Sequence, residues 1–231
     1  MSTENIAHEK RYRDWRAQYN AVFAPENRSP QQDEQFSLTD GYSIRSKAYI
    51  YDGDLHLCGS ESELLDNEGK VRYVWRNLDT DGEFCSLFRH RNGKYYLIFR
   101  TELYGYSVLE VESGQEMHYV PACVHPEEGQ KAEEVFIWTG ADYDPGADLL
   151  AVTGCIWACP YSTIVLDFSC PLQPSPRSIG WICGTSLTRT IPGLTISSLS
   201  AGEATLCSSD AAIQRMAGGK KREYHWSGCS P

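Results

Sequence analysis

The chain has 231 residues, 41% of them hydrophobic, and its acidic residues outnumber its basic ones to give a formal net charge of −10 at pH 7. This length and composition predict one domain, or one domain with appendages, and enough apolar material for a core. The acidic balance argues against nucleic acid and against an anionic membrane surface as partners, because both repel negative charge.

Residues 1–35 are expected to form a helix and a linker. Apolar and aromatic side chains recur every three or four residues between Thr3 and Phe23, which places them on one helix face that packs against a sheet, and Pro25 ends the helix. This segment is charged where a signal peptide is apolar, and no run is long enough to span a membrane, so we expect a cytoplasmic protein. The apolar face consists of Tyr12, Trp15, Tyr19 and Val22, and the basic residues, expected to be solvated, are Lys10, Arg11, Arg13 and Arg16.

Residues 36–172 read as a β-repeat domain, in which short apolar runs alternate with turn signals. The strongest hairpin signal is Asn92-Gly93, because both residue types tolerate positive φ. Such spacing is typical of an all-β meander. The other turn signals are Asp52-Gly53, Asn67–Gly69, Asp81-Gly82, Ser113-Gly114 and Pro145-Gly146.

The densest apolar material lies between Glu133 and Pro171, where three strands are expected at Val135–Trp138, Leu149–Thr153 and Ser162–Phe168. These runs are apolar throughout instead of alternating, a pattern typical of strands that are buried on both faces. We therefore expect this stretch to form the centre of the fold.

A weak internal repeat accompanies these strands. The segment that starts at Gly93 (GKYYLIF…YSVLEVES) parallels the one that starts at Gly146 (GADLLAV…YSTIVLDFS), and a strand precedes each copy. Two strands of a propeller blade follow this pattern. At roughly forty residues a blade, the domain holds about three blades, whereas a closed propeller needs four or more. We expect a mainly β fold of antiparallel propeller-like or stacked-meander sheets with an N-terminal helix.

The segments Gly154–Tyr161 (GCIWACPY) and Asp167–Pro171 (DFSCP) resemble a signature of uncharacterised bacterial proteins. Those proteins also carry segments similar to Tyr104–Gly114 and Phe136–Thr139. The resemblance covers about residues 43–171, and it implies the β-repeat unit and a bacterial cytoplasmic setting. No activity is established for the group, so the resemblance implies no catalytic residue.

Residues 173–231 form a segment of different composition, rich in Ser, Gly and Thr. It carries three acidic and six basic residues, a formal charge of +3, against −13 for the part before it. Such material buries too little apolar surface to offset the entropy lost on ordering, and we expect a poorly ordered or aberrant tail. Three interpretations stay open: a flexible tail, a shifted reading frame that was never selected to fold, and a functional basic tail.

The nine cysteines are odd in number and follow no export signal, which favours reduced thiols. Cys155 and Cys159, with Cys170 nearby, are weak candidates for zinc ligands, because their spacing is not that of a zinc knuckle and no second pair follows. A catalytic alternative pairs Cys159 as nucleophile with His118 or His125 as base, but nothing positions a third, orienting group. We interpret these cysteines as structural thiols.

Three aspartates surround the Pro145-Gly146 turn at the spacing of oxygen ligands in a calcium loop: Asp142, Asp144 and Asp148. The bidentate Glu of a helix-loop-helix calcium site is missing. An acidic hairpin turn is therefore the interpretation that the sequence favours.

No paired carboxylates, phosphate-binding loop or catalytic triad stands out, so we expect a binding protein without a cofactor. Its partner is expected to be another protein, contacted by the loop that contains Trp157, Pro160 and Tyr161. The first alternative is a Cys- or metal-dependent enzyme that uses the Cys155–Cys159 turn. The second is an acidic immunity-type protein that neutralises a basic toxin, supported by net charge alone.

Overall fold

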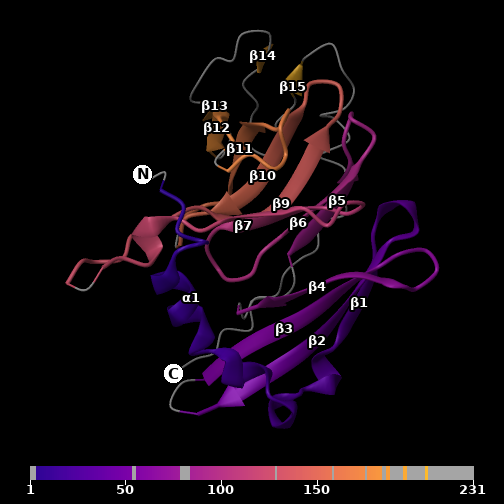
Figure 1. Cartoon of the computed structure of the whole chain (residues 1–231). Coiled ribbons are helices and arrows are strands. Elements are labelled where there is room, and N and C mark those ends of the chain that lie inside the picture. The colour runs from indigo at the N-terminus through magenta and orange to yellow at the C-terminus, as the bar shows by residue number, and fades with distance from the viewer. Residues whose placement is uncertain are drawn as a thin grey trace.

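A computed structural model shows three antiparallel β-sheets of four or five strands in a stack, preceded by one short α-helix (Figure 1). In the described part of the chain, the three sheets do not close into a ring. No helix among the described residues is long and apolar enough to cross a membrane. The structure describes residues 4–53, 56–78, 84–127, 129–157, 159–174 and 176–183, together with the short stretches 186–187, 195–196 and 206–207.

Each sheet is a meander in which neighbouring strands follow one another along the chain. The first sheet contains β1 (Glu34–Ser37), β2 (Ser43–Asp52), β3 (His56–Leu65) and β4 (Val71–Asn77). The middle sheet contains β5 (Cys85–Arg89), β6 (Tyr95–Phe99), β7 (Tyr106–Glu110) and β8 (Glu116–Tyr119). The third sheet contains β9 (Ile137–Asp144), β10 (Leu149–Cys155), β11 (Ser162–Asp167), β12 (Ser178–Cys183) and β13 (Ser186–Leu187).

The remaining elements are short. The α-helix is α1 (Lys10–Ala17), and β14 (Thr195–Ile196) pairs with β15 (Leu206–Cys207). The 3-10 turns are η1 (Asn20–Phe23), η2 (Pro25–Asn27), η3 (Pro30–Gln32), η4 (Thr39–Gly41) and η5 (Ala122–Val124).

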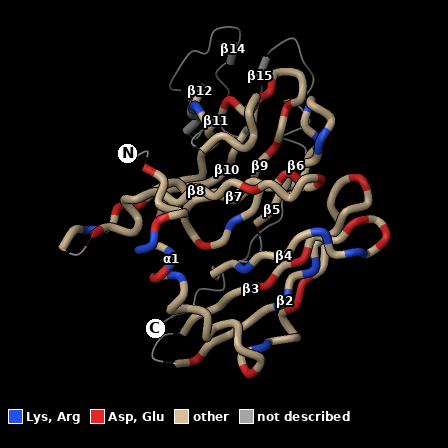
Figure 2. Tube along the Cα trace, viewed as in Figure 1, with Lys and Arg blue, Asp and Glu red and all other residues tan. Residues whose placement is uncertain are grey.

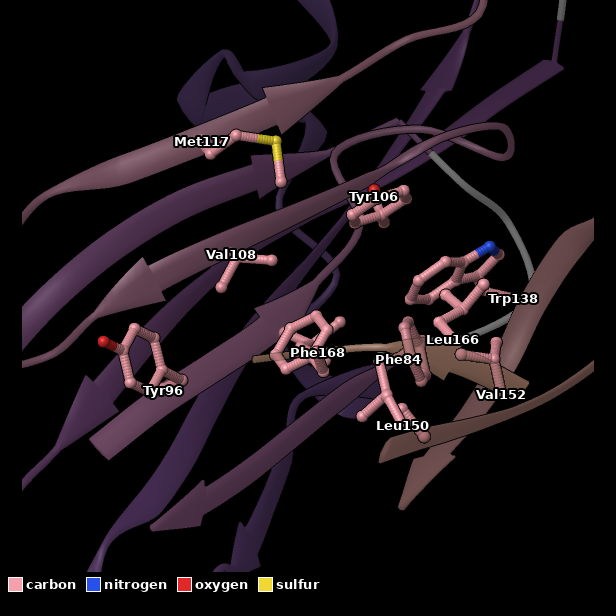
Figure 3. Packing of buried hydrophobic residues seen from close by; sticks show 12 residues of the cluster. Phe84, Tyr96, Tyr106, Val108, Met117, Trp138, Leu150, Val152, Leu166 and Phe168 are labelled. Atoms are coloured by element: carbon pink, nitrogen blue, oxygen red, sulfur yellow. The ribbon is translucent and has the colours of Figure 1, made fainter. Parts of the chain in front are cut away.

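The core lies on both faces of the middle sheet. Because successive side chains of a strand point to opposite faces, Tyr96 and Ile98 of β6 pack toward the third sheet, while Leu97 and Phe99 pack toward the first. The cluster between the middle and third sheets includes Tyr106, Trp138, Leu150 and Phe168 (Figure 3). The middle sheet is thus the layer that apolar contacts cover on both sides.

This arrangement corrects the expected centre of the fold. In β10, buried Leu150 and Val152 alternate with half-buried Leu149 and exposed Thr153, whereas every residue of β7 is buried. The uninterrupted apolar pattern of residues 133–171 was therefore a misleading sign of burial on both faces. In β10 the residues that face away from the middle sheet are small or only partly buried. The hydrophobicity of a strand does not tell whether another layer of the fold covers that face.

The hairpins and the repeat agree with the sequence pattern. Gly93 has φ +89°, and its N–H donates to the carbonyl of His90 at 2.9 Å, which closes the turn between β5 and β6. At the Pro145-Gly146 turn the residue with positive φ is Asp148, at +54°. The two repeat copies form β6–β7 and β10–β11, the second and third strands of their sheets. The turn signal at Asp81-Gly82 lies outside the described residues.

The N-terminal segment joins the first two sheets and is less helical than expected. Residues 4–6 run beside the end of β8, where the N–H of Ile6 donates to the carbonyl of Val120 at 3.0 Å, and residues 7–9 form a turn before α1. Tyr12 of α1 packs beside Val120, whereas Val22 of η1 packs against Tyr49 of β2. The expected apolar stripe exists, but its early residue Tyr12 and its late residue Val22 pack on different sheets, and α1 ends between them at Ala17.

The third sheet continues past residue 172, the boundary expected for the β-repeat domain. Strand β12 pairs along β11, with Ile164 opposite Trp181 and Ser162 opposite Cys183. The boundary therefore falls inside this sheet. The stretch that forms β12, SIGWIC, is too short and too rich in small residues to stand out from its surroundings. Most of the expected tail, 173–231, lies outside the described residues.

Candidate functional site

Residues 156–161 connect β10 with β11 and form what we call the aromatic loop. The N–H of Cys159 donates to the carbonyl of Ile156 at 2.8 Å, which reverses the chain, and Pro160 cannot donate a backbone hydrogen bond to continue a strand. Trp157 is 51% exposed and Tyr161 57% exposed. The sequence predicts that these two rings and Pro160 share one loop between strands, and all three residues are exposed there.

Large exposed apolar side chains are rare in the described part of the chain. Besides Trp157 and Tyr161, they include only Val71 and Val74 of β4. Trp138, in contrast, is buried at 5% exposure against Tyr106. Trp and Tyr are the residues that most often anchor protein interfaces. The aromatic loop therefore combines the two residue types most useful for binding on a turn that two paired strands hold.

Cys155 and Cys159 flank this turn. Burial raises the pKa of the Cys155 thiol, and the nearby Cys159 raises it further, so Cys155 is a neutral thiol at pH 7. Cys159 and Cys170 are exposed, but Cys170 follows β11 at its opposite end. Within the described ranges, no group of three or more His, Cys, Asp or Glu side chains is placed to hold a metal ion.

The two histidines considered as a base for Cys159 are engaged elsewhere. His118 of β8 contacts the Ser107 hydroxyl at 2.7 Å and Glu116 at 3.3 Å, on the face of the middle sheet that packs against the first. His125 contacts Glu102 at 3.1 Å. Since the third sheet packs on the other face of the middle sheet, the structure does not bring His118 together with Cys159.

The three aspartates do not converge. Asp142 of β9 is exposed, opposite Ala151, whereas a carboxylate oxygen of Asp144 accepts the N–H of Gly146 at 2.8 Å within the turn. Asp148 is buried and points to the middle sheet, where Arg91 contacts it at 2.6 Å. The arrangement is an acidic hairpin turn in which the Asp148 carboxylate contacts the middle sheet.

Asp148 belongs to a polar network that the sequence did not reveal. The Tyr143 hydroxyl donates to Asp148 at 2.7 Å, and Nε2 of buried His90 lies 3.5 Å from the same carboxylate and 3.2 Å from the carbonyl of Phe168. Burial raises the pKa of Tyr143, and the hydrogen bond to Asp148 raises it further. The network joins the β5–β6 turn to the β9–β10 turn. The sequence predicts each turn, but it does not predict that the two turns lie side by side.

A matching network lies between the first and middle sheets. Tyr73 of β4 donates a hydrogen bond to Glu116, which also contacts His118, and His118 contacts Ser107. Burial and the hydrogen bond to Glu116 both raise the pKa of Tyr73. Ser107 is only 1% exposed, so no substrate reaches it. We interpret both tyrosine–carboxylate–histidine groups as polar contacts that orient one sheet on the next.

An open cavity of about 370 Å³ lies between the N-terminal segment and the loop around residues 122–133. Its walls carry charges of both signs and little apolar surface, unlike the mostly apolar pockets that bind small molecules. The charged residues that line it are Glu4, Arg11, Glu127, Lys131 and Glu133.

Comparison with known proteins adds no assignment. No family model, no curated protein and no solved structure matches this chain.

Proposed function

We propose that this protein binds another protein through the aromatic loop. The observation that carries the proposal is the exposure of Trp157 and Tyr161 in one loop, while Trp75 and Trp138 are buried between the sheets. A rigid ring with few rotatable bonds loses little conformational entropy on binding. A centrally placed Trp or Tyr anchor contributes about 2 kcal/mol or more to binding free energy.

The scaffold suits this role. Loops held by a packed sheet present side chains in fixed positions, and β10 and β11 are paired from Leu149–Asp167 to Gly154–Ser162 at the base of the loop. The net charge of −10 favours a partner with a basic surface, since opposite charges speed association.

The exposed face of the first sheet is a poorer binding surface. Charges of both signs are interspersed along β2, β3 and β4 (Figure 2). They pair with one another: Lys47 contacts Glu63 at 2.6 Å, and Arg76 contacts Glu61 at 3.0 Å. A partner would have to compete with these pairs and desolvate them.

The test places a photoreactive phenylalanine analogue at position 157 of the full chain. The matched control places it at Val74, which is 46% exposed on the first sheet. In extracts of the source cells, position 157 is expected to give an adduct with one defined protein, and unlabelled wild-type chain should compete it away. The adduct should persist in the presence of the Trp157→Ala, Tyr161→Ala double variant as competitor.

The identified protein is then purified and its affinity measured. Loss of a 2 kcal/mol anchor corresponds to roughly a 30-fold weaker Kd for Trp157→Ala. Equal adducts from positions 157 and 74, or unchanged affinity of the Trp157→Ala variant, would contradict the proposal.

A further inference from the structure

The aromatic loop has a thiol at each end of its turn. Cys155 is the last residue of β10, paired opposite Ile137, and the chain then reverses between Ile156 and Cys159 through a hydrogen bond of 2.8 Å. A four-residue turn brings its first and last Cα atoms within about 7 Å. Cys155 directly precedes that turn, so the two thiols lie on either side of a chain reversal, and a disulfide between them requires a Cα–Cα distance of about 4.4–6.8 Å.

Both thiols are free in the structure, and each is at least partly exposed. Cys159 is exposed and Cys155 is half-buried, and neither is part of a disulfide. Cys159 is one of the causes of the raised pKa of Cys155, as expected when two thiols approach each other. Exposure makes Cys159 the thiol that reacts first, and Cys155 the one that follows.

We propose that Cys155 and Cys159 form a reversible disulfide that closes the aromatic loop around Trp157. The oxidant is a low-molecular-weight disulfide of the glutathione class. The Cys159 thiolate attacks one sulfur of oxidised glutathione, whose S–S bond breaks and releases one glutathione thiolate. Cys155 then loses its proton to solvent and attacks the Cys159 sulfur, which releases the second glutathione thiolate. The two protein thiols are oxidised, and one glutathione disulfide is reduced to two thiols.

Two other cysteines are considered as alternative disulfide partners: one is too far from the loop, and the experiment distinguishes the other. Cys170 follows β11, and the six residues of that strand hold it on the order of 20 Å from the loop. The backbone of Cys183 pairs with Ser162 at the loop end of the sheet, so Cys183 is the competitor that a test must distinguish.

The disulfide would restrict the turn that carries Trp157. Its formation needs no partner protein, so this inference stands or falls separately from the proposed function. If the partner binds through Trp157, the redox state of the two cysteines would change affinity by restricting the loop.

The experiment incubates the folded full chain with glutathione buffers of graded oxidation, traps free thiols with an alkylating reagent under acid quench, and cleaves before aspartate. Cleavage before Asp148 and Asp167 releases a peptide, 148–166, whose only cysteines are Cys155 and Cys159. We expect this peptide to appear unalkylated and lighter by two hydrogen atoms in oxidising buffer. It should return to the doubly alkylated form in reducing buffer.

Two variants fix the assignment. Cys155→Ser should stop at the mixed disulfide of Cys159 with glutathione, whereas Cys170→Ser should form the internal disulfide as wild type does. Closure should also be faster at mildly alkaline than at neutral pH, since Cys155 must ionise. A peptide 148–166 linked to the one that contains Cys183, or a wild-type chain that stops at the mixed disulfide, would overturn the inference.

Discussion

Removing the carboxylate of Asp148 should weaken the contact between the middle and third sheets. The Asp148 side chain is 7% exposed, accepts a hydrogen bond from Tyr143 at 2.7 Å and pairs with Arg91 at 2.6 Å. Its φ of +54° lies in the left-handed region, which Asp and Asn adopt more readily than Ala.

Three effects set the size of the loss for Asp148→Ala. The lost hydrogen bond leaves the Tyr143 hydroxyl without its acceptor and costs about 1 kcal/mol. Arg91 is 60% exposed, so its ion pair contributes at most about 1 kcal/mol. Left-handed backbone at Ala adds about 1 kcal/mol. The variant should therefore be less stable than wild type by about 3 kcal/mol, and Asp148→Asn, which keeps the backbone preference and one acceptor, by about 1 kcal/mol.

Urea unfolding of the full chain, followed by tryptophan fluorescence, measures these free energies. Combining Asp148→Ala with Tyr143→Phe should reveal a coupling of about 1 kcal/mol. The matched control is Asp144→Ala, which removes one exposed contact to Gly146 and should cost less than about 1 kcal/mol. If Asp148→Ala lies within about 0.5 kcal/mol of wild type, or shows no coupling to Tyr143, the network does not join the sheets.

Three further outcomes follow from the structure. In single-Trp variants, iodide should quench Trp157, which is 51% exposed, more strongly than Trp138, which is 5% exposed, and equal quenching would contradict this placement. Gly154→Ala should destabilise by about 3 kcal/mol in urea unfolding and far more than Gly146→Ala, because a Cβ at Gly154 would lie 1.9 Å from the Ile137 carbonyl oxygen. Lys47 and then Arg45 lower the pKa of Glu63, so the stability that the Glu63 carboxylate contributes is present above the ordinary glutamate pKa and is lost as pH falls through the lowered pKa. The unfolding free energies of Glu63→Gln and wild type should therefore converge as pH falls through the lowered pKa. A difference that stays constant with pH would contradict the pairing.

Local signals predicted the hairpins and the order of strands. Asn92-Gly93 favours a turn with positive φ, and Gly93 has this conformation. The repeat that starts at Gly93 and Gly146 corresponds to a pair of adjacent strands in each of two sheets. Both features could therefore be predicted from the sequence. The strand at β12 was not, because Ser and Gly supply no apolar pattern and the strand depends on hydrogen bonds to β11.

The sequence pattern did not predict which residues of different sheets contact one another. His90 and Asp148 are far apart in sequence, and only the stacking of two sheets brings them together. The same holds for Tyr73 and Glu116. In the candidate site the opposite is true: Trp157, Pro160 and Tyr161 are neighbours in sequence, and a short turn between strands was enough to predict their exposure.

The middle sheet is the buried layer of the stack, and hydrogen exchange of the full chain, measured by mass spectrometry, tests this arrangement most directly. Strand β6 is bonded to β5 and β7 and covered on both faces, whereas β4 pairs with β3 alone among the described strands. Amides of β6 and β7 should exchange most slowly, at the rate set by global unfolding, and those of β4 and β1 much faster. Exchange of β6 as fast as β4, or slowest exchange in β10 and β11, would contradict the account.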